Sequence, residues 1–202
     1  DINVDLLRRE EGAASALSRA ARVIVYSPWA VERLASLDPT LRDRIEVIHP
    51  SVDIEVSGAS EADLSAGFNF LLPSGIRRVK DPAFAIAPLT ALREVFPEIN
   101  LTIAGPILDK DEWARLRVAM EGREWVNHRV ADYEDMPMLY ASADVVLNTS
   151  VAEGLSNTVL EAMALGRPVL ASDCEGNRAV ITDDVDGLLY RQGDENDFRV
   201  KA

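Results

Sequence analysis

The feature that most constrains this chain is a repeated alternation of short apolar runs with longer amphipathic stretches. Runs such as Val23–Tyr26 predict buried strands, and the stretches between the runs predict helices with one apolar face. Ser27-Pro28 supplies a helix-start signal, and Gly166 followed by Pro168 supplies a helix-stop signal. Strand, helix and strand in close succession form βαβ units. The sequence therefore predicts an α/β fold with a mostly parallel sheet.

The expected elements fall into two series, separated by a polar segment at 55–66 that predicts a linker or an irregular loop. The first series is a helix at 5–20, a strand at 22–27, a helix at 28–36 and a strand at 45–49. The second has strands at 68–74, 101–104, 126–131, 144–148, 168–172 and 187–190. Its helices are expected at 82–96, 110–121, 136–142 and 158–165, the first with Asp81 as N-cap. The polar tail 191–198 is predicted to be loose.

The net negative charge of the chain argues against two classes of partner, nucleic acids and anionic membranes. The 202 residues include 21 Lys and Arg against 34 Asp and Glu, a formal net charge of −13. A nucleic-acid partner needs a basic face, and anionic membranes repel this charge, so we expect neither. A small anionic ligand stays compatible with the sequence if a few basic residues converge.

Several sequence features that the chain lacks indicate where in the cell we expect the protein. No basic segment followed by an apolar one opens the chain, and no apolar run approaches about 18 residues, so we expect no signal peptide and no transmembrane segment. Asp1 in place of Met predicts a processed or trimmed chain. The single Cys174 has no disulfide partner, and with only His49 and His128 there is no metal-ligand spacing. We expect no metal and a cytoplasmic location.

In parallel sheets, ligands lie beyond the carboxyl ends of the strands. The first loop at such an end is 74–82, where Arg77, Arg78 and Lys80 place three cations within four positions. Gly75 allows close backbone approach, and these cations suit a diphosphate. The alternative is that they are solvated surface charges. Gly105-Pro106, after the next strand, is a weaker signal that a simple turn explains equally well.

The strongest candidate is the segment 150–163, which leads from a strand into a helix whose free N–H groups can bind an anion. Glu153 and Glu161 bracket its start, and carboxylates accept hydrogen bonds from sugar hydroxyls. A phosphate-plus-sugar ligand fits this combination. Two alternatives stay open: Thr158 and Glu161 have the spacing of a capping box, and Glu153 fits an ordinary exposed loop acid.

The segment Glu153–Ser172 resembles the Glu-x7-Glu signature of retaining glycosyltransferases of family 4, the glycosyl transferases group 1 type. The resemblance extends over about residues 68–190 and includes Gly105-Pro106 and the run 186–189. Val79–Pro82 and Gly176-Asn177 are most similar to the subgroup named glycosyltransferase one domain-containing. The resemblance implies a GT-B architecture, and for this chain a Rossmann-like parallel sheet with helices on both faces.

The resemblance also implies roles. Arg77 or Arg78, with Lys80, would clamp the donor's diphosphate and stabilise the leaving nucleotide without a metal. Glu153 would contact the transferred sugar, and Glu161 the ribose. The donor would be a UDP or GDP sugar, transferred with retained anomeric configuration to an unknown acceptor. The other donor-binding positions implied are Gly75, Gly105, Val130, Ala131, Gly154, Leu155, Ser156, Asn157 and Thr158.

The expected domain organisation follows from which domain of the family each part of the chain is similar to. Residues 1–56 are similar to the end of an N-terminal acceptor domain with its linker, and 57–202 to a donor-binding domain. Such a remnant exposes apolar surface, so self-association is expected. The chain would bind the donor yet transfer nothing alone. The alternatives are a non-catalytic nucleotide-sugar-binding or protein-interaction module with the same fold, and a different GT-B-like enzyme such as an epimerase or a phosphorylase.

Overall fold

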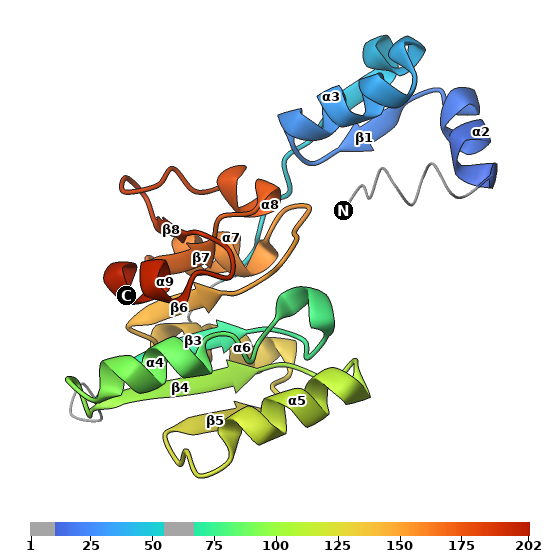
Figure 1. Cartoon of the computed structure of the whole chain (residues 1–202). Coiled ribbons are helices and arrows are strands. Elements are labelled where there is room, and N and C mark those ends of the chain that lie inside the picture. The colour runs from blue at the N-terminus through green and yellow to red at the C-terminus, as the bar shows by residue number, and fades with distance from the viewer. Residues whose placement is uncertain (1–10, 55–66) are drawn as a thin grey trace.

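A computed structural model of the chain describes residues 11–54 and 67–202. Its centre is a six-stranded sheet in the order β5-β4-β3-β6-β7-β8, with every neighbouring pair parallel (Figure 1). The strands are β3 (Phe68–Pro73), β4 (Ile99–Ala104), β5 (Val126–Arg129), β6 (Val145–Asn148), β7 (Val169–Ser172) and β8 (Leu188–Tyr190). The chain builds outward from β3 through β4 to β5, then returns to β6 and builds the other way. The topological switch point therefore lies between β3 and β6.

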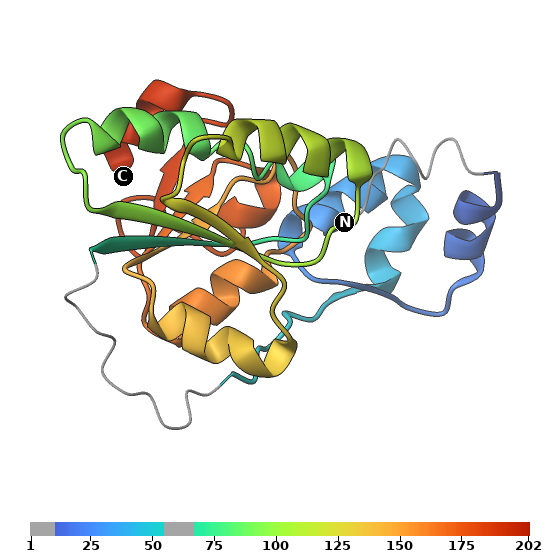
Figure 2. The same cartoon turned by 90° about the horizontal axis from the view of Figure 1, so that it is seen from below.

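Helices cover both faces of this sheet (Figure 2). On one face lie α4 (Ile86–Arg93), α5 (Lys110–Met120) and α9 (Glu195–Lys201), which bury Leu89, Leu116 and Phe198 against the strands. On the other lie α6 (Met136–Ala141) and α7 (Asn157–Ala164), which bury Tyr140, Val159 and Ala162. The predicted α/β class with helices on both faces is confirmed.

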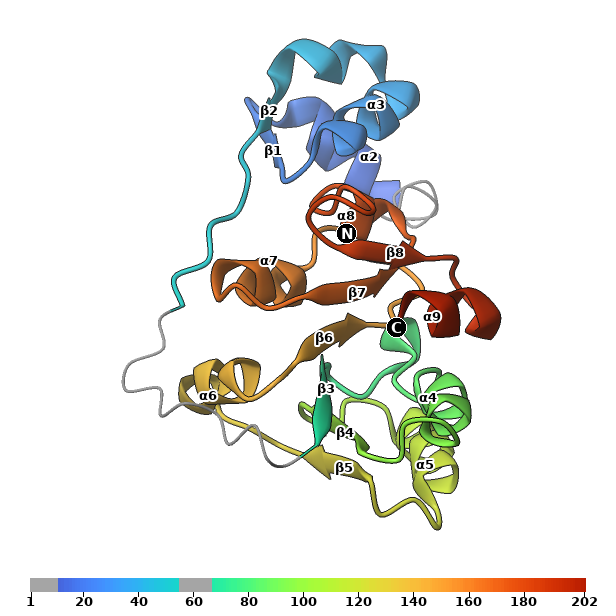
Figure 3. The same ribbon diagram turned by 90° about the vertical axis from the view of Figure 1, so that its left-hand side faces the viewer.

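A smaller unit precedes the sheet. It contains α2 (Glu11–Arg19), β1 (Val23–Val25), α3 (Pro28–Leu37), the 3₁₀ helix η1 (Pro39–Arg44) and β2 (Ile45–Val47). The two strands are parallel, and α3 packs on one side of them. Figure 3 shows this unit beside α8 (Glu175–Arg178), where Arg33 and Glu175 form an exposed ion pair at 3.7 Å. The other side of the strands leaves Ile24, Tyr26 and Ile48 exposed.

The expected helix at 82–96 is wrong at its start. Residues 82–85 form turns, and α4 begins at Ile86. Asp81 is not its N-cap: it lies in the left-handed region at φ 42° and closes the 3₁₀ helix η2 (Arg78–Lys80). Its carboxylate pairs instead with Arg115 of α5. A long-range ion pair therefore outweighs the local capping signal.

The tail predicted to be loose is ordered. Asp194 caps α9 by accepting hydrogen bonds from the backbone N–H groups of Asn196 and Asp197. Phe198 is fully buried and packs edge-on against the rings of Phe84 and Tyr190. One aromatic anchor in a polar segment thus fixes the last helix on the sheet.

The other predicted elements are present with ends shifted by a few residues. Each predicted strand is one to three residues too long, except that β4 begins two residues before the strand expected at 101–104. Trp113 and Trp125 pack against the core. The expected linker at 55–66 and residues 5–10 of the first helix lie outside the described residues. The boundary between residues 56 and 57 also lies there, so the division into two domains stays a prediction.

Candidate active site

The loops singled out in the sequence meet at the carboxyl edge of the sheet, at its switch point. The loop after β3 carries the three cations, and the loop after β6 carries Glu153 and leads into α7. Backbone contacts join the two loops: the N–H of Val151 donates to the carbonyl of Val79 at 2.8 Å, and the Thr149 hydroxyl donates to the carbonyl of Lys80 at 2.8 Å. Two loops separated by some seventy positions of sequence therefore form one surface.

Lys80 and Glu153 form an ion pair at the centre of this surface, between Nζ and Oε1. The side chains are only 17% and 9% exposed, so the pair is largely removed from water. The alternative that Glu153 is an ordinary exposed loop acid is wrong, because Glu153 is buried. Oε1 takes every hydrogen bond that Glu153 makes among the described residues, which leaves Oε2 as a free acceptor.

A buried polar network holds Glu153 in place. Its Oε1 also accepts from the Ser150 hydroxyl at 2.6 Å and from Asn148 Nδ2 at 3.3 Å. Asn148 Nδ2 donates further to the Ser156 hydroxyl at 2.9 Å, and Asn148 Oδ1 accepts from Asn177 Nδ2 at 3.2 Å. Because each side chain is fixed by the next, the carboxylate is preorganised.

The absence of a side chain at Gly176 makes room for the backbone of Glu153. A Cβ on Gly176 would lie 2.6 Å from the carbonyl carbon of Glu153, closer than real Cβ atoms approach. Gly176 and Asn177 both lie in helix α8, and both are buried. Gly105 plays a similar part, since a Cβ there would lie 2.6 Å from the carbonyl carbon of Ser74. At Gly75 a Cβ would meet only the flexible end of Leu108, at 2.8 Å.

Helix α7 begins one residue earlier than expected, and its cap is different. Ser156 is the N-cap, and its hydroxyl accepts from the Val159 N–H at 3.4 Å. The capping-box alternative for Thr158 and Glu161 is therefore wrong. Thr158 instead donates to the carbonyl of Pro73 at 3.4 Å, and Glu161 Oε2 accepts from the Tyr140 hydroxyl at 2.6 Å. The Glu161 carboxylate is thus a side-chain acceptor beside the helix start.

The remaining predicted positions lie around this centre. Arg77 and Arg78 are exposed, and neither guanidinium has an ion-pair or hydrogen-bond partner among residues 11–54 and 67–202. Val130 and Ala131 follow β5 two strands away, and Val130 is 63% exposed. Gly154 and Leu155 are half-buried, and Asn157 is exposed on the first turn of α7. The structure brings the cations and Glu153 to one edge, with Val130 and Ala131 on its flank, and it places Glu161 one turn into α7.

Sequence reasoning missed the side chains that support this centre. Asn148, Ser150 and Ser172, which are buried polar residues at or beside strand ends, were not singled out, and neither was Tyr140, which is buried on α6. The available signal was a polar residue inside or directly after an apolar strand, as at Asn148-Thr149-Ser150 and Ser172. Such residues need partners when buried, and so they mark a network.

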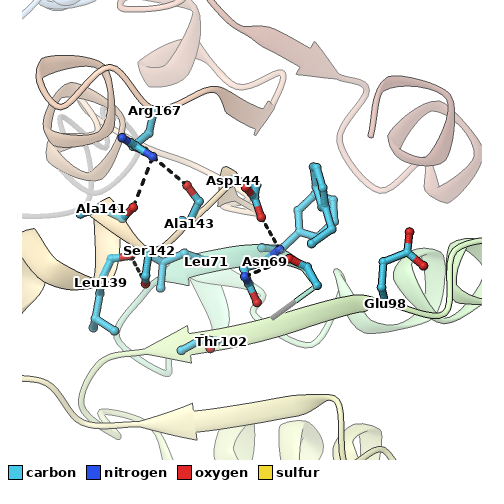
Figure 4. Close-up of a pocket in the computed structure, with 13 residues that line it drawn as sticks. Asn69, Leu71, Glu98, Thr102, Leu139, Ala141, Ser142, Ala143, Asp144 and Arg167 are labelled. Atoms are coloured by element: carbon cyan, nitrogen blue, oxygen red, sulfur yellow. Dashed lines mark hydrogen bonds between the residues drawn. The ribbon is translucent and has the colours of Figure 1, made fainter. Parts of the chain in front are cut away.

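A cavity lies at the opposite edge of the sheet. It has a volume of about 640 Å³ and lies at the amino ends of β3 and β6, lined by Asn69, Asp144 and Arg167 among others (Figure 4). Two of its charged side chains bond to backbone: Asp144 accepts from the Asn69 N–H at 2.7 Å, and Arg167 donates to the carbonyls of Ala141 and Ala143 at 3.3 Å. These bonds tie the start of β6 to its neighbours.

Two further findings concern the described residues alone. In the segments 11–54 and 67–202 there is no group of His, Cys, Asp and Glu that could hold a metal ion. In the same two segments, none of the helices combines the length and the apolar character needed to cross a membrane.

Comparisons with known proteins agree with this geometry. The sequence profile of the family described as "Glycosyl transferases group 1" matches residues 69–201. "Glycosyltransferase 1 domain-containing protein 1" of Xenopus tropicalis is 28% identical over 204 residues, which covers 94% of this chain and 59% of that protein. A "D-inositol 3-phosphate glycosyltransferase" of Paenarthrobacter aurescens strain TC1 is 31% identical over 198 residues, which covers 90% and 48%. The chain therefore spans about half the length of the curated relatives it matches.

Solved structures share the fold. The crystal structure of Anabaena HepE in complex with UDP-glucose superimposes with a TM-score of 0.84 at 22% identity, covering 98% of this chain and 57% of HepE. At that identity the likeness shows the fold alone. It confirms the Rossmann-like, GT-B-type architecture expected from the sequence.

Proposed function

The chain belongs to the glycosyl transferases group 1 family, and from that premise we propose that its carboxyl edge binds a nucleoside diphosphate sugar. The proposed reaction is transfer of the sugar with retained anomeric configuration, as in family 4, to an acceptor of unknown identity. The described part of the chain supplies the donor-binding side of that reaction. The relatives are named glycosyltransferases, and HepE is solved with UDP-glucose, which supports UDP as the nucleotide to test first; GDP is the alternative.

The observation that carries this proposal is the Lys80–Glu153 pair at the switch point. A lysine ammonium has three N–H donors, and Glu153 takes one of them. Two donors are left for phosphate oxygens, while Oε2 of Glu153 is left for a sugar hydroxyl. The pair thus presents a cation and an acceptor side by side, which matches the junction of a diphosphate and a sugar.

The leaving group of the proposed reaction is a nucleoside diphosphate, which gains negative charge as the bond to the sugar breaks. Lys80, with Arg77 or Arg78, would stabilise that charge electrostatically and without a metal. The two arginines are unpaired among the described residues, so phosphate does not have to displace a carboxylate from them. Their geometry permits bidentate contact with phosphate oxygens.

The rest of the donor is proposed to lie along α7 and the end of β5. Glu161 would accept from the ribose hydroxyls, and the first turn of α7, including Thr158, would offer free N–H groups to phosphate. The backbone of Gly154 and Leu155 would approach the sugar. Val130 and Ala131, beyond the end of β5, would contact the base.

The two-part organisation is also proposed. Residues 1–56 would belong to an acceptor-binding domain and its linker, and 57–202 to the donor-binding domain. The uncovered face that carries Ile24, Tyr26 and Ile48 supports this, since a parallel sheet is normally buried on both faces. The same face would permit self-association of this chain. We propose a cytoplasmic location on the single unpaired cysteine, Cys174.

Calorimetric titration of the chain with UDP, GDP and ADP, first without metal and then with magnesium, tests the proposal. Selective binding of one nucleotide without metal is the expected result. Binding that requires magnesium would contradict the metal-independent site. A matched control is Arg167→Ala, which removes a cation at the amino edge and should leave binding unchanged. No binding by any nucleotide would favour a non-catalytic protein-interaction module.

A further inference from the structure

Tyr140 is a buried titratable side chain that the proposed reaction does not use. It lies on α6 within the core cluster that also contains Val159 and Ala162 of α7, and it is fully buried. Its hydroxyl donates to Glu161 Oε2 at 2.6 Å. Burial, and next the hydrogen bond to the Glu161 carboxylate, raise the pKa of Tyr140 far above its ordinary value. The phenol therefore stays protonated and remains a donor.

This hydrogen bond leaves part of the Glu161 carboxylate available. Glu161 is half-buried, and its Oε1 has no hydrogen-bond partner among the described residues. A glutamate side chain has three rotatable bonds, so a free Glu161 would sample several orientations. A short bond from a rigid, fully buried phenol restricts that sampling. The second oxygen is thereby held beside α7, along which the donor is proposed to lie.

We propose that Tyr140 is a positioning residue that orients Glu161 toward the ribose of the donor, and so makes the site select ribonucleotides over deoxyribonucleotides. This inference rests on the proposed function, because it assigns a support to the same nucleotide site. A carboxylate held in place gains a hydrogen bond from a ribose hydroxyl at little cost in side-chain freedom. A ligand that lacks the hydroxyl leaves the desolvated acceptor without a donor.

The test compares the affinities of the ribonucleotide and its deoxy analogues on one protein. The chain is titrated with UDP, 2′-deoxy-UDP and 3′-deoxy-UDP, or with the GDP series if GDP binds better. The unsubstituted chain should prefer the ribonucleotide over at least one analogue by about tenfold or more. Tyr140→Phe, which keeps the ring and removes only the hydroxyl, should reduce this ratio to less than about threefold.

Stability does not confound this measurement. A smaller folded fraction of Tyr140→Phe lowers the apparent affinity for each ligand equally, so it cancels from the ratio. Tyr190→Phe is a matched control for this ratio, because it removes a buried tyrosine hydroxyl that donates to the backbone carbonyl of Asn148 and not to Glu161. It should leave the ratio unchanged.

A double-mutant cycle shows whether Tyr140 acts through Glu161. Glu161→Ala should abolish the preference, and adding Tyr140→Phe to it should change nothing more. Additive losses, or a preference that survives in Tyr140→Phe, would overturn the inference alone. An unsubstituted chain that binds nucleotides without preference would overturn the ribose role of Glu161 as well. A chain that binds no nucleotide would overturn the proposed function and this inference with it.

Discussion

The two edges of the sheet differ in what their charged side chains do. At the amino edge, Asp144 and Arg167 bond to backbone N–H and carbonyl groups beside a cavity of about 640 Å³. At the carboxyl edge, Lys80 and Glu153 pair with each other and keep donors and an acceptor to spare. The proposed function puts the ligand at the pair that a buried network holds, and not at the cavity. The two edges therefore give opposite predictions for substitution.

Lys80→Ala should have the largest effect, because it leaves a buried carboxylate without its cation. We expect a loss of about 3–5 kcal/mol in the free energy of unfolding and about a hundredfold loss of UDP affinity. Uridine, which has no phosphate, should change by less than about threefold. Chemical denaturation and calorimetry measure the two losses.

The double variant Lys80→Ala with Glu153→Gln separates the two effects. Neutralising the carboxylate should restore much of the stability and none of the UDP affinity. If uridine and UDP lose affinity equally in Lys80→Ala, Lys80 does not contact phosphate.

Gly176→Ala should come next, since a Cβ there would collide with the backbone of Glu153. A forced shift of a packed segment costs about 1–3 kcal/mol, and here it would also displace Glu153 from its network. Gly166→Ala is the matched control: nothing lies within 4 Å of its Cβ, and only its φ of 65° resists the change. Thermal unfolding should show a loss in both variants, whereas nucleotide affinity should fall only in Gly176→Ala.

Arg167→Ala probes the opposite edge. It leaves the carbonyls of Ala141 and Ala143 without a donor, so we expect a loss of about 1–2 kcal/mol in the free energy of unfolding. Nucleotide affinity should stay within about twofold of the unsubstituted chain, since nothing at the carboxyl edge changes. A large fall in affinity without unfolding would mean that the cavity in Figure 4 takes part in binding.

Arg77→Ala and Arg78→Ala should have the smallest effect on stability, less than about 0.5 kcal/mol each, because both side chains are exposed and unpaired among the described residues. One of the two should lower UDP affinity about tenfold, and the other by less than about threefold. Parallel titrations of both variants identify the phosphate ligand. If neither variant changes UDP affinity, both arginines are solvated surface charges.

The order of strands and helices was predictable, because apolar periodicity and helix signals are local properties. The exceptions have non-local causes. The carboxylate of Asp81 pairs with Arg115, thirty-four positions away in sequence, instead of capping a helix. Phe198 orders a polar tail by packing on the ring of Phe84, in the turns before α4, and on the ring of Tyr190 in β8. Both outcomes depend on contacts that appear only after the chain folds.

The site was predictable to the same extent. The positions of Lys80, Glu153 and Glu161 followed from the spacing of residues and from resemblance to a family. Their partners did not. The burial of Glu153 depends on Gly176, and the orientation of Glu161 depends on Tyr140, and each partner lies about twenty positions from the residue it serves. Side chains that support a site leave only the weak signal of a polar residue at a buried position.

Hydrogen exchange of backbone amides with and without UDP tests the central claim most directly, because it reports on both edges in one experiment. We predict slower exchange on binding in the loops 75–80 and 150–158 at the carboxyl edge. The segments 67–71 and 141–144 at the amino edge should exchange at unchanged rates. Slower exchange confined to the amino edge would contradict the account and would place the nucleotide in the large cavity.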